Sequence, residues 1–184
     1  MRIVSWNVNG LRTLGGYRPW FTHKTWCDSL DHLGGDIVCF QECKVTRDSL
    51  VDAGKGLGSK FCCIDGWQAF YNLHPVKGYS GTACYTRDEA CRPIKMEEGI
   101  TGRYAEEGGS KGSVSAAALG GIGVPLPEKE RIGCITRDAR DEMEMKDFIE
   151  IDQEGRAVVL DCGLFVLFNL YCPNETGPER RPYK

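Results

Sequence analysis

Polar side chains follow two apolar runs of the chain and could hold a metal ion. Asn7 and Asn9 come directly after the run that ends at Trp6, and Glu42 ends the run that begins at Asp36. If these runs form neighbouring strands, the amide oxygen of Asn7 and the carboxylate of Glu42 converge at one end of a sheet. Hard oxygen donors of this kind suit Mg²⁺, which takes few protein ligands and keeps several waters. The plainer alternative, which residue types alone favour, is a turn at Asn7 and a solvated strand end at Glu42.

Two further segments place a tyrosine where a strand or a turn ends. A long apolar run ends at Tyr171, and Pro173 and Asn174 follow it. A hydroxyl at that point could donate to a phosphate oxygen or to a developing charge. Tyr79 lies in the segment Gly78–Gly81, whose glycines allow close backbone approach and whose ring could lie against a nucleic-acid backbone. Taken singly, a solvated tyrosine at the edge of the core and a plain hairpin turn are the simpler interpretations.

Short apolar strands must position these side chains. We expect strands over Arg2–Trp6, Asp36–Glu42, Trp67–Leu73, Thr82–Arg87, Ala157–Cys162 and Leu164–Tyr171, the first of them buried. We expect helices through Trp26, Leu30 and Leu33, stopped by Gly34, and over Thr46–Ala53 with Thr46 as N-cap. Strands dominate and helices are interspersed, which indicates an α/β or α+β fold with layered sheets.

Length and composition indicate one globular domain. The chain has 184 residues, of which 41% are hydrophobic, and this excludes an intrinsically disordered protein. The net charge of −3 gives no overall basic signature, so any nucleic-acid binding must come from a local patch. Arg12, Lys44, Arg47, Arg180 and Arg181 could supply such a strip. The range Gly99–Glu130 holds eight glycines and a run of small residues, so we expect a loop insertion within the domain.

The ten cysteines resemble those of a protein kept in a reducing compartment. No two are spaced C-x-x-C, which argues against a zinc knuckle. Cys39, Cys84, Cys162 and Cys172 lie in apolar runs, where a thiol acts as a small hydrophobic group. The chain shows no signal peptide and no apolar span of 18 residues, so we expect an intracellular protein without a membrane partner.

Taken together, the four segments resemble the endonuclease/exonuclease/phosphatase superfamily. They are 5–12 (SWNVNGLR), 36–44 (DIVCFQECK), 78–81 (GYSG) and 170–174 (LYCPN), and they occur in this order. Within the superfamily they resemble the exonuclease III branch of apurinic/apyrimidinic (AP) endonucleases, and most closely the AP endonuclease 2 type. Asn9, the run Lys44–Asp48 and the run Glu97–Gly102 favour that type, and the resemblance extends from Met1 to Lys184.

The resemblance implies a fold and an activity. The fold is a four-layer αββα sandwich, with two sheets face to face and helices outside. The activity is hydrolysis of a DNA phosphodiester 5′ to an abasic site in base excision repair, dependent on Mg²⁺ or Mn²⁺. A 3′→5′ exonuclease and 3′-end-cleaning activity accompanies it, so the partner is double-stranded DNA with abasic sites or blocked 3′ ends. The resemblance also implies residence in the nucleus or in mitochondria.

The resemblance assigns roles to individual residues. Glu42 matches the metal carboxylate, Asn7 its amide neighbour and Tyr171 the catalytic tyrosine near the scissile phosphate. Residues expected to contact DNA are Tyr79, Lys44 and Asn174 by position, with Arg180 and Arg181 added as nearby cations.

Two motifs of the family are absent from the sequence. The Gly-Asp-x-Asn motif that positions the water and the Ser-Asp-His motif that carries the essential histidine do not occur. His23, His32 and His74 lie outside the family motifs, so we expect structural or solvated roles for them. We therefore expect residues 1–184 to be the truncated N-terminal part of one such domain. Made alone, this part should expose an apolar patch and should be inactive and poorly soluble.

Two alternatives remain open. One is another phosphodiesterase or phosphatase of the superfamily, which would share the metal glutamate. The other is a non-catalytic, decayed copy that keeps the sheets and binds DNA.

Overall fold

The first sheet brings together strands that are far apart in the sequence. The computed structural model describes residues 1–51, 61–75, 78–101, 132 and 145–173. The four strands of this sheet are β1 (Ile3–Asn7), β2 (Ile37–Gln41), β3 (Trp67–Asn72) and β4 (Thr82–Arg87), in the order β1-β2-β4-β3. The first pair, β1 and β2, is parallel, with Asn7 opposite Gln41, and the other pairs are antiparallel. The C-terminal ends of β1 and β2 therefore lie side by side at one end of the sheet.

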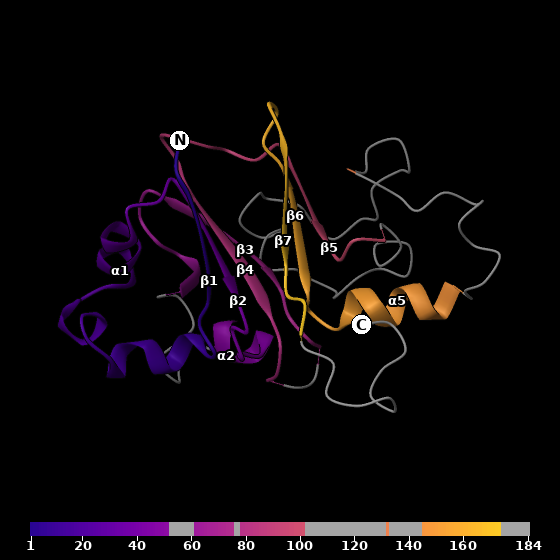
Figure 1. Ribbon diagram of the computed structural model, residues 1–184, viewed down its shortest axis with the longest axis horizontal. Helices are drawn as coiled ribbons and strands as arrows, with labels where there is room; N and C mark the ends of the chain where they lie inside the picture. Colours follow the sequence, from indigo (N-terminus) through magenta and orange to yellow (C-terminus); the bar gives the residue numbers. More distant parts are fainter. Residues whose placement is uncertain (52–60, 76–77, 102–131, 133–144, 174–184) are drawn as a thin grey trace.

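Helices cover the outer face of this sheet (Figure 1). They are the 3₁₀ helices η1 (Leu11–Gly16) and η2 (Trp20–Thr22) and the α-helices α1 (Trp26–Leu33) and α2 (Arg47–Val51). Helix α1 begins with a capping box, in which Thr25 accepts from the backbone of Asp28 and Asp28 accepts from the backbone of Thr25. It ends at Gly34, whose left-handed conformation suits a glycine.

A second, antiparallel sheet packs against the first. Its strands are β5 (Lys95–Glu98), β6 (Ala157–Asp161) and β7 (Val166–Leu170), in that order. Strand β7 lies against β2 and β4, and β6 lies against β3 and β4. Helix α5 (Met145–Gln153) lies on the far side, beside β5 and β6 (Figure 1). Two sheets between two helical layers form the four-layer sandwich that the family resemblance implies.

Two apolar cores hold these layers together. One lies between the first sheet and its helices, where Leu30, Phe40 and Tyr85 are fully buried. The other lies between the two sheets and consists of Ile37, Cys39, Phe70, Cys84, Cys91, Val158 and Leu160. Burial of both faces explains why β2 reads as an uninterrupted apolar run.

Most of the predicted elements are confirmed within one or two residues at each end. The first strand is correctly placed but is not buried, because β1 is an edge strand whose residues alternate between exposed and half-buried. Strand β5 and helix α5 were not predicted. Among the cysteines of the apolar runs, Cys39 and Cys84 are buried, whereas Cys172 is exposed because the chain leaves the sheet at Leu170.

Some expectations concern residues outside the described part of the chain. Only residues 99–101 of the expected glycine-rich insertion 99–130 are described, and residues 52–53 of the expected second helix are not. Thr46 does cap that helix, since its Oγ1 accepts the N–H of Ser49 at 3.3 Å. Among the helices in the described ranges, none is long and apolar enough to cross a membrane.

Candidate active site

The parallel strands β1 and β2 place Asn7 beside Glu42. Because Asn7 pairs with Gln41, the next residue along β2 lies next to the end of β1. Asn7 Nδ2 donates to Glu42 Oε1 at 2.9 Å, and Asn7 Oδ1 accepts the N–H of Asn9 at 3.1 Å. The two residues therefore converge as predicted, but the amide nitrogen of Asn7 faces the carboxylate, and not the amide oxygen as expected.

Lys44 occupies the other side of this carboxylate. Its Nζ lies 3.0 Å from Glu42 Oε2 and also donates to Asn9 Oδ1. The hydrogen bond from Asn7 holds the pKa of Glu42 below its ordinary value, and Lys44 lowers it further by hydrogen bonding and by charge. Partial burial acts in the opposite direction. The result is a carboxylate that stays ionised at neutral pH, as a metal ligand must.

Tyr171 reaches the same carboxylate from the second sheet. It follows β7, and its N–H donates to Arg156 O at 2.8 Å. Because Arg156 directly precedes β6, this bond extends the pairing of β6 and β7 by one residue. A hydrogen bond from the Tyr171 hydroxyl also contributes to the lowered pKa of Glu42. The two sheets thus each supply one part of the candidate site.

The backbone is strained where these side chains meet. Four non-glycine residues of the described chain have positive φ, namely Asn9 (50°), Glu42 (53°), Lys44 (51°) and Ser80 (50°). All four lie at the end of the first sheet where β1 and β2 end. A left-handed conformation costs a non-glycine residue on the order of 1 kcal/mol and persists only where the surroundings impose it. Here Cys43 N–H donates to Gly81 O and Lys44 N–H to Ser80 O, both at 2.9 Å.

The loop that carries Tyr79 lies at the same end of the first sheet. It joins β3 to β4 and is fixed by the two bonds to Cys43 and Lys44 and by a bond from Ser80 Oγ to Glu154 O. The Tyr79 ring packs against His74 with centroids 4.7 Å apart. A β-carbon on Gly81 would lie 3.3 Å from Cys43 Cβ, so this glycine allows the loop to approach the segment after β2 closely. The approach of this loop to a ligand stays a prediction.

The donor set fits a divalent cation that keeps most of its waters. Glu42 offers a carboxylate that is 20% exposed, and Asn7 offers an amide oxygen with one lone pair beyond the Asn9 bond. In the described part of the chain, no group of three His, Cys, Asp or Glu side chains could hold a metal ion. One carboxylate and one amide are nevertheless consistent with Mg²⁺, which often binds through one or two protein ligands.

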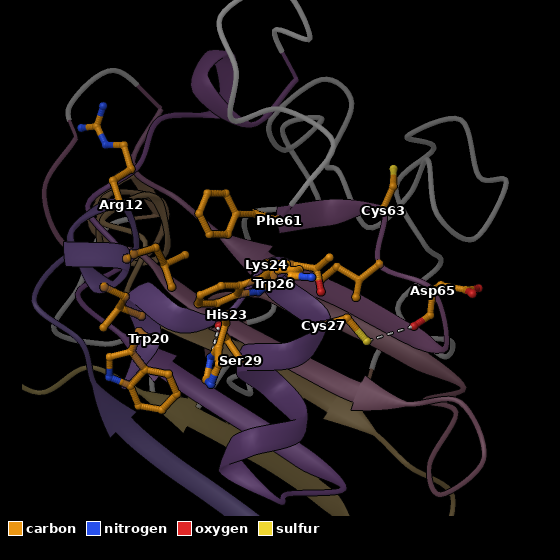
Figure 2. Close-up of a pocket in the computed structure, with 15 residues that line it drawn as sticks. Arg12, Trp20, His23, Lys24, Trp26, Cys27, Ser29, Phe61, Cys63 and Asp65 are labelled. Carbon is orange, nitrogen blue, oxygen red and sulfur yellow. Dashed lines mark hydrogen bonds between the residues drawn. The ribbon is translucent and has the colours of Figure 1, made fainter. Parts of the chain in front are cut away.

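A separate cavity of about 470 Å³ lies on the helical side of the first sheet (Figure 2). Its lining comes from η1, η2, the start of α1 and residues 61–65. Trp26 packs edge-on against Phe61 with ring centroids 4.8 Å apart, and Arg12 lies at the margin of the cavity. Asn7, Glu42 and Tyr171 do not line it, so this cavity is separate from the candidate site.

Comparison with known proteins identifies the family. Residues 4–177 match the model of the Endonuclease/Exonuclease/phosphatase family. The chain belongs to this family. The DNA-(apurinic or apyrimidinic site) endonuclease 2 of Schizosaccharomyces pombe is 34% identical over 100% of this chain and 31% of its own length. The human protein of the same name is 30% identical over 100% of this chain and 33% of its own length.

A solved structure shows the same fold. The catalytic domain of Xenopus laevis APE2 is 29% identical, with a TM-score of 0.62 over 98% of this chain and 47% of that domain. The chain therefore spans about a third of the length of the curated relatives that it matches. Nucleases of this family depend in general on a divalent metal, which agrees with the oxygen donors at Asn7 and Glu42.

The other residues expected to contact DNA, which are Asn174 and the arginines of the predicted positive strip, differ in their placement. Arg12 is exposed, and its Nη2 lies 3.5 Å from Lys44 O, so it adjoins the site. Arg47 is half-buried at the start of α2. The residues that lie outside the described part of the chain are Asn174, Arg180 and Arg181.

Two of the three histidines lie in the helical layer, away from Glu42. His23 shares a hydrogen bond of 3.0 Å with Ser29 Oγ and stacks 5.0 Å from His32, and both rings contact Trp20. These contacts agree with the structural roles predicted for His23 and His32. His74 is closer to the site than its sequence position suggests, because it packs against Tyr79.

Gln41 and Asn169 behind the site are not predicted as functional, and for Asn9, which the sequence places after the first strand, the contact with Lys44 is not predicted. Asn9 accepts from Lys44, and the Asn-Gly pair at Asn9 signals the positive φ that turns it there. Gln41 and Asn169 lie between the sheets. Their only sequence signal is a polar amide inside an otherwise apolar strand.

Proposed function

We propose that the chain carries the metal-binding part of the active site of a DNA-repair nuclease of the AP endonuclease 2 type. The reaction is hydrolysis of the phosphodiester 5′ to an abasic site, with 3′→5′ removal of nucleotides or blocking groups at 3′ ends. The observation that carries the proposal is that Tyr171, from the second sheet, lies beside Glu42 at the end of the first sheet. Asn7 and Lys44 contact the same carboxylate. Identity of 34% along the whole chain favours this type over other members of the family.

The four side chains suit an attack on an anionic phosphodiester. Asn7 and Glu42 would hold Mg²⁺ or Mn²⁺, which when bound neutralises phosphate oxygens and stabilises a leaving 3′ oxygen. Lys44 keeps Glu42 ionised and adds a positive charge beside it. Tyr171 supplies a hydroxyl donor next to Glu42, where it can donate to a phosphodiester oxygen and take up developing charge.

We propose double-stranded DNA with abasic sites or blocked 3′ ends as the substrate. Lys44 and exposed Arg12 form a positive edge at the site, and Tyr79 is held beside them by the bond between Ser80 and Lys44. Asn174, Arg180 and Arg181 are proposed to extend this contact. Because such contacts are largely with phosphates, binding should weaken steeply with salt.

A cleavage assay tests the function. The longest natural polypeptide that contains this chain is incubated with an abasic DNA duplex and Mg²⁺, and nicking 5′ to the abasic site is expected. Glu42→Gln should lower the rate by at least about 100-fold, the scale of losing one electrostatic group of an active site. The matched control is Glu89→Gln, an exposed glutamate in the turn after β4, which should keep the rate.

The alternatives give different results in the same assay. Hydrolysis of a phosphoinositide with no action on abasic DNA would identify another phosphodiesterase of the family and overturn the proposal. Tight binding of abasic DNA without any metal-dependent cleavage would identify a non-catalytic copy.

We also propose that the protein resides in the nucleus, with mitochondria as a second location. The nine cysteines of the described chain are all free thiols, and a reducing compartment favours that state. Imaging of a fluorescent fusion in its own cells checks the location, and a signal confined to secretory vesicles would contradict it.

A further inference from the structure

The last residue of β2 reaches across the space between the two sheets. The Gln41 side chain is 9% exposed, and its Nε2 donates to Asn169 Oδ1 at 2.7 Å and to Ser5 Oγ at 3.0 Å. The carbonyl oxygen of Gln41 accepts the N–H of Val8 at 3.0 Å. Both the backbone and the side chain are thus fixed immediately before Glu42, where the chain must turn into a left-handed conformation.

Asn169 uses its whole amide to hold β7 against the first sheet. It is 3% exposed, and its Nδ2 donates to Phe40 O at 3.1 Å and to Ala83 O at 2.9 Å, while its Oδ1 accepts from Gln41. A rotated amide would direct Oδ1 at two carbonyl oxygens, so the three partners determine one orientation. Asn169 therefore fixes the position of β7 over β2 and β4.

Both amides are close in sequence to the candidate catalytic groups. Gln41 directly precedes Glu42, and Asn169 lies two residues before Tyr171. The hydrogen bond between Gln41 and Asn169 consequently joins the strand that carries the metal carboxylate to the strand that carries the phosphate-site hydroxyl. Buried polar contacts that are fully satisfied rigidify the elements they connect.

We propose that Gln41 and Asn169 are positioning residues that fix the separation between the Glu42 carboxylate and the Tyr171 hydroxyl. This inference rests on the proposed function, since it treats Glu42 and Tyr171 as the metal side and the phosphate side of one site. The two amides act through these residues and touch neither metal nor DNA. The competing explanation is that the amides only stabilise the packing of the sheets, as buried hydrogen-bonded groups do elsewhere.

Asn72 provides a control of the same residue type and similar burial. It is fully buried at the end of β3, and its Nδ2 donates to Asp152 O at 3.1 Å and to Ala157 O at 2.8 Å. It therefore also joins the two halves of the sandwich, but β4 separates its strand from β2. Asn72→Leu and Asn169→Leu each remove amide hydrogen bonds to two backbone carbonyl groups, one far from Glu42 and one near it.

Mn²⁺ is the probe for the experiment, which uses the longest natural polypeptide that contains this chain. Electron paramagnetic resonance counts the free ion and gives its dissociation constant, and NMR reports how strongly bound Mn²⁺ broadens the ring signals of labelled Tyr171. The wild-type chain should bind Mn²⁺ in a way that Glu42→Gln weakens. We expect Asn169→Leu and Gln41→Met to weaken Mn²⁺ binding about tenfold and to reduce the broadening at Tyr171. Asn72→Leu should keep both, although it also lowers the midpoint of thermal unfolding.

The outcomes separate this inference from the proposed function. Gln41→Met leaves the two carbonyl bonds of Asn169 in place, so it tests the pair even if Asn169→Leu fails to fold. Unchanged Mn²⁺ affinity and unchanged broadening in Gln41→Met would overturn the inference alone. Equal losses of Mn²⁺ affinity and of broadening in Asn72→Leu and Gln41→Met would also overturn it. General packing of the sheets would then determine the geometry of the site. Wild-type chain that binds no Mn²⁺, or binds it independently of Glu42, overturns the metal site and this inference with it.

Discussion

The charge of Glu42 depends on neighbours that the fold brings to it. Asn7 lowers its pKa most, and Lys44 and Tyr171 lower it further. A carboxyl group with a lowered native pKa stabilises the fold above its ordinary pKa, here 4.5, and this contribution is lost as pH falls through the native pKa. We expect Lys44→Met to raise the pKa of Glu42 and so to reduce the stability gained between acidic and neutral pH. Carbon-13 NMR titration of the Glu42 carboxyl measures this pKa.

The control for this titration is Lys24→Met. Lys24 is exposed before α1 and makes no contact with Glu42, so the pKa of Glu42 should not change. An unchanged pKa in Lys44→Met would show that the ammonium group has no electrostatic role at the site.

Sequence alone predicts which residues gather at the site better than how they are oriented. Asn7 and Glu42 are predictable because both end apolar strands that pair in parallel. The direction of the Asn7 amide is not, since it depends on the N–H of Asn9. The approach of Tyr171 to Glu42 is also unpredictable from local pattern, because it requires two sheets to stack in one register.

The capping box of α1 gives a prediction at the scale of one element. Thr25 accepts from the N–H of Asp28 at 3.1 Å, and the Asp28 side chain accepts from the N–H of Thr25 at 2.8 Å. Removing an N-cap hydroxyl costs about 1 kcal/mol of helix stability. We therefore expect Thr25→Ala to lower the free energy of unfolding by about that amount in urea denaturation. Thr25→Ser keeps the hydroxyl and should retain most of the stability, and equal losses in both variants would contradict the capping role.

The turn after α5 gives a second prediction for an element. Gly155 has φ of 70°, and a β-carbon on it would lie 2.6 Å from His74 N and 2.9 Å from Leu73 C. Gly66 has a similar φ of 74° with no atom within 4 Å of such a carbon. Gly66→Ala should therefore cost only the strain, about 1 kcal/mol, whereas Gly155→Ala should cost about 1–3 kcal/mol more. Urea denaturation of both variants checks the difference, and equal costs would show that the turn is not in contact with Leu73 and His74.

The elements that sequence reasoning found share a simple signal. Strands such as β2 and β6 are apolar runs between turn residues, and both are buried on two faces. Strand β5 has no such signal, because Lys95–Glu98 is mostly charged and only half-buried. Helix α5 is short, and its apolar residues Phe148, Ile149 and Ile151 are interspersed with acidic residues. The position of α5 depends on hydrogen bonds to residues distant in sequence, since Asp152 Oδ1 accepts hydrogen bonds from the N–H groups of Ile100 and Thr101.

Exposure is a property of the whole molecule that local sequence does not reveal. Ile3 of β1 is 46% exposed, although its strand begins with the same Ile-Val pair as the buried β2. Strand composition predicts pairing, whereas burial depends on which strands of the second sheet lie above. Strand β7 lies over β2 and β4, so the edge strand β1 remains partly open.

The outer face of β7 leads to a prediction about self-association. Val166, Phe168 and Leu170 point to one side and are 43%, 56% and 44% exposed, and within the described residues β7 pairs only with β6. An apolar edge strand with open backbone groups favours pairing with another chain, and a charged residue at the edge opposes it. We expect the 184-residue chain to self-associate at micromolar concentrations and Phe168→Lys to shift it toward monomer in sedimentation velocity. Phe21→Lys is the matched control, because Phe21 is 51% exposed but lies on the helix η2 rather than on a strand. A wild-type chain that stays monomeric, or equal effects of the two substitutions, would show that the β7 edge does not mediate association.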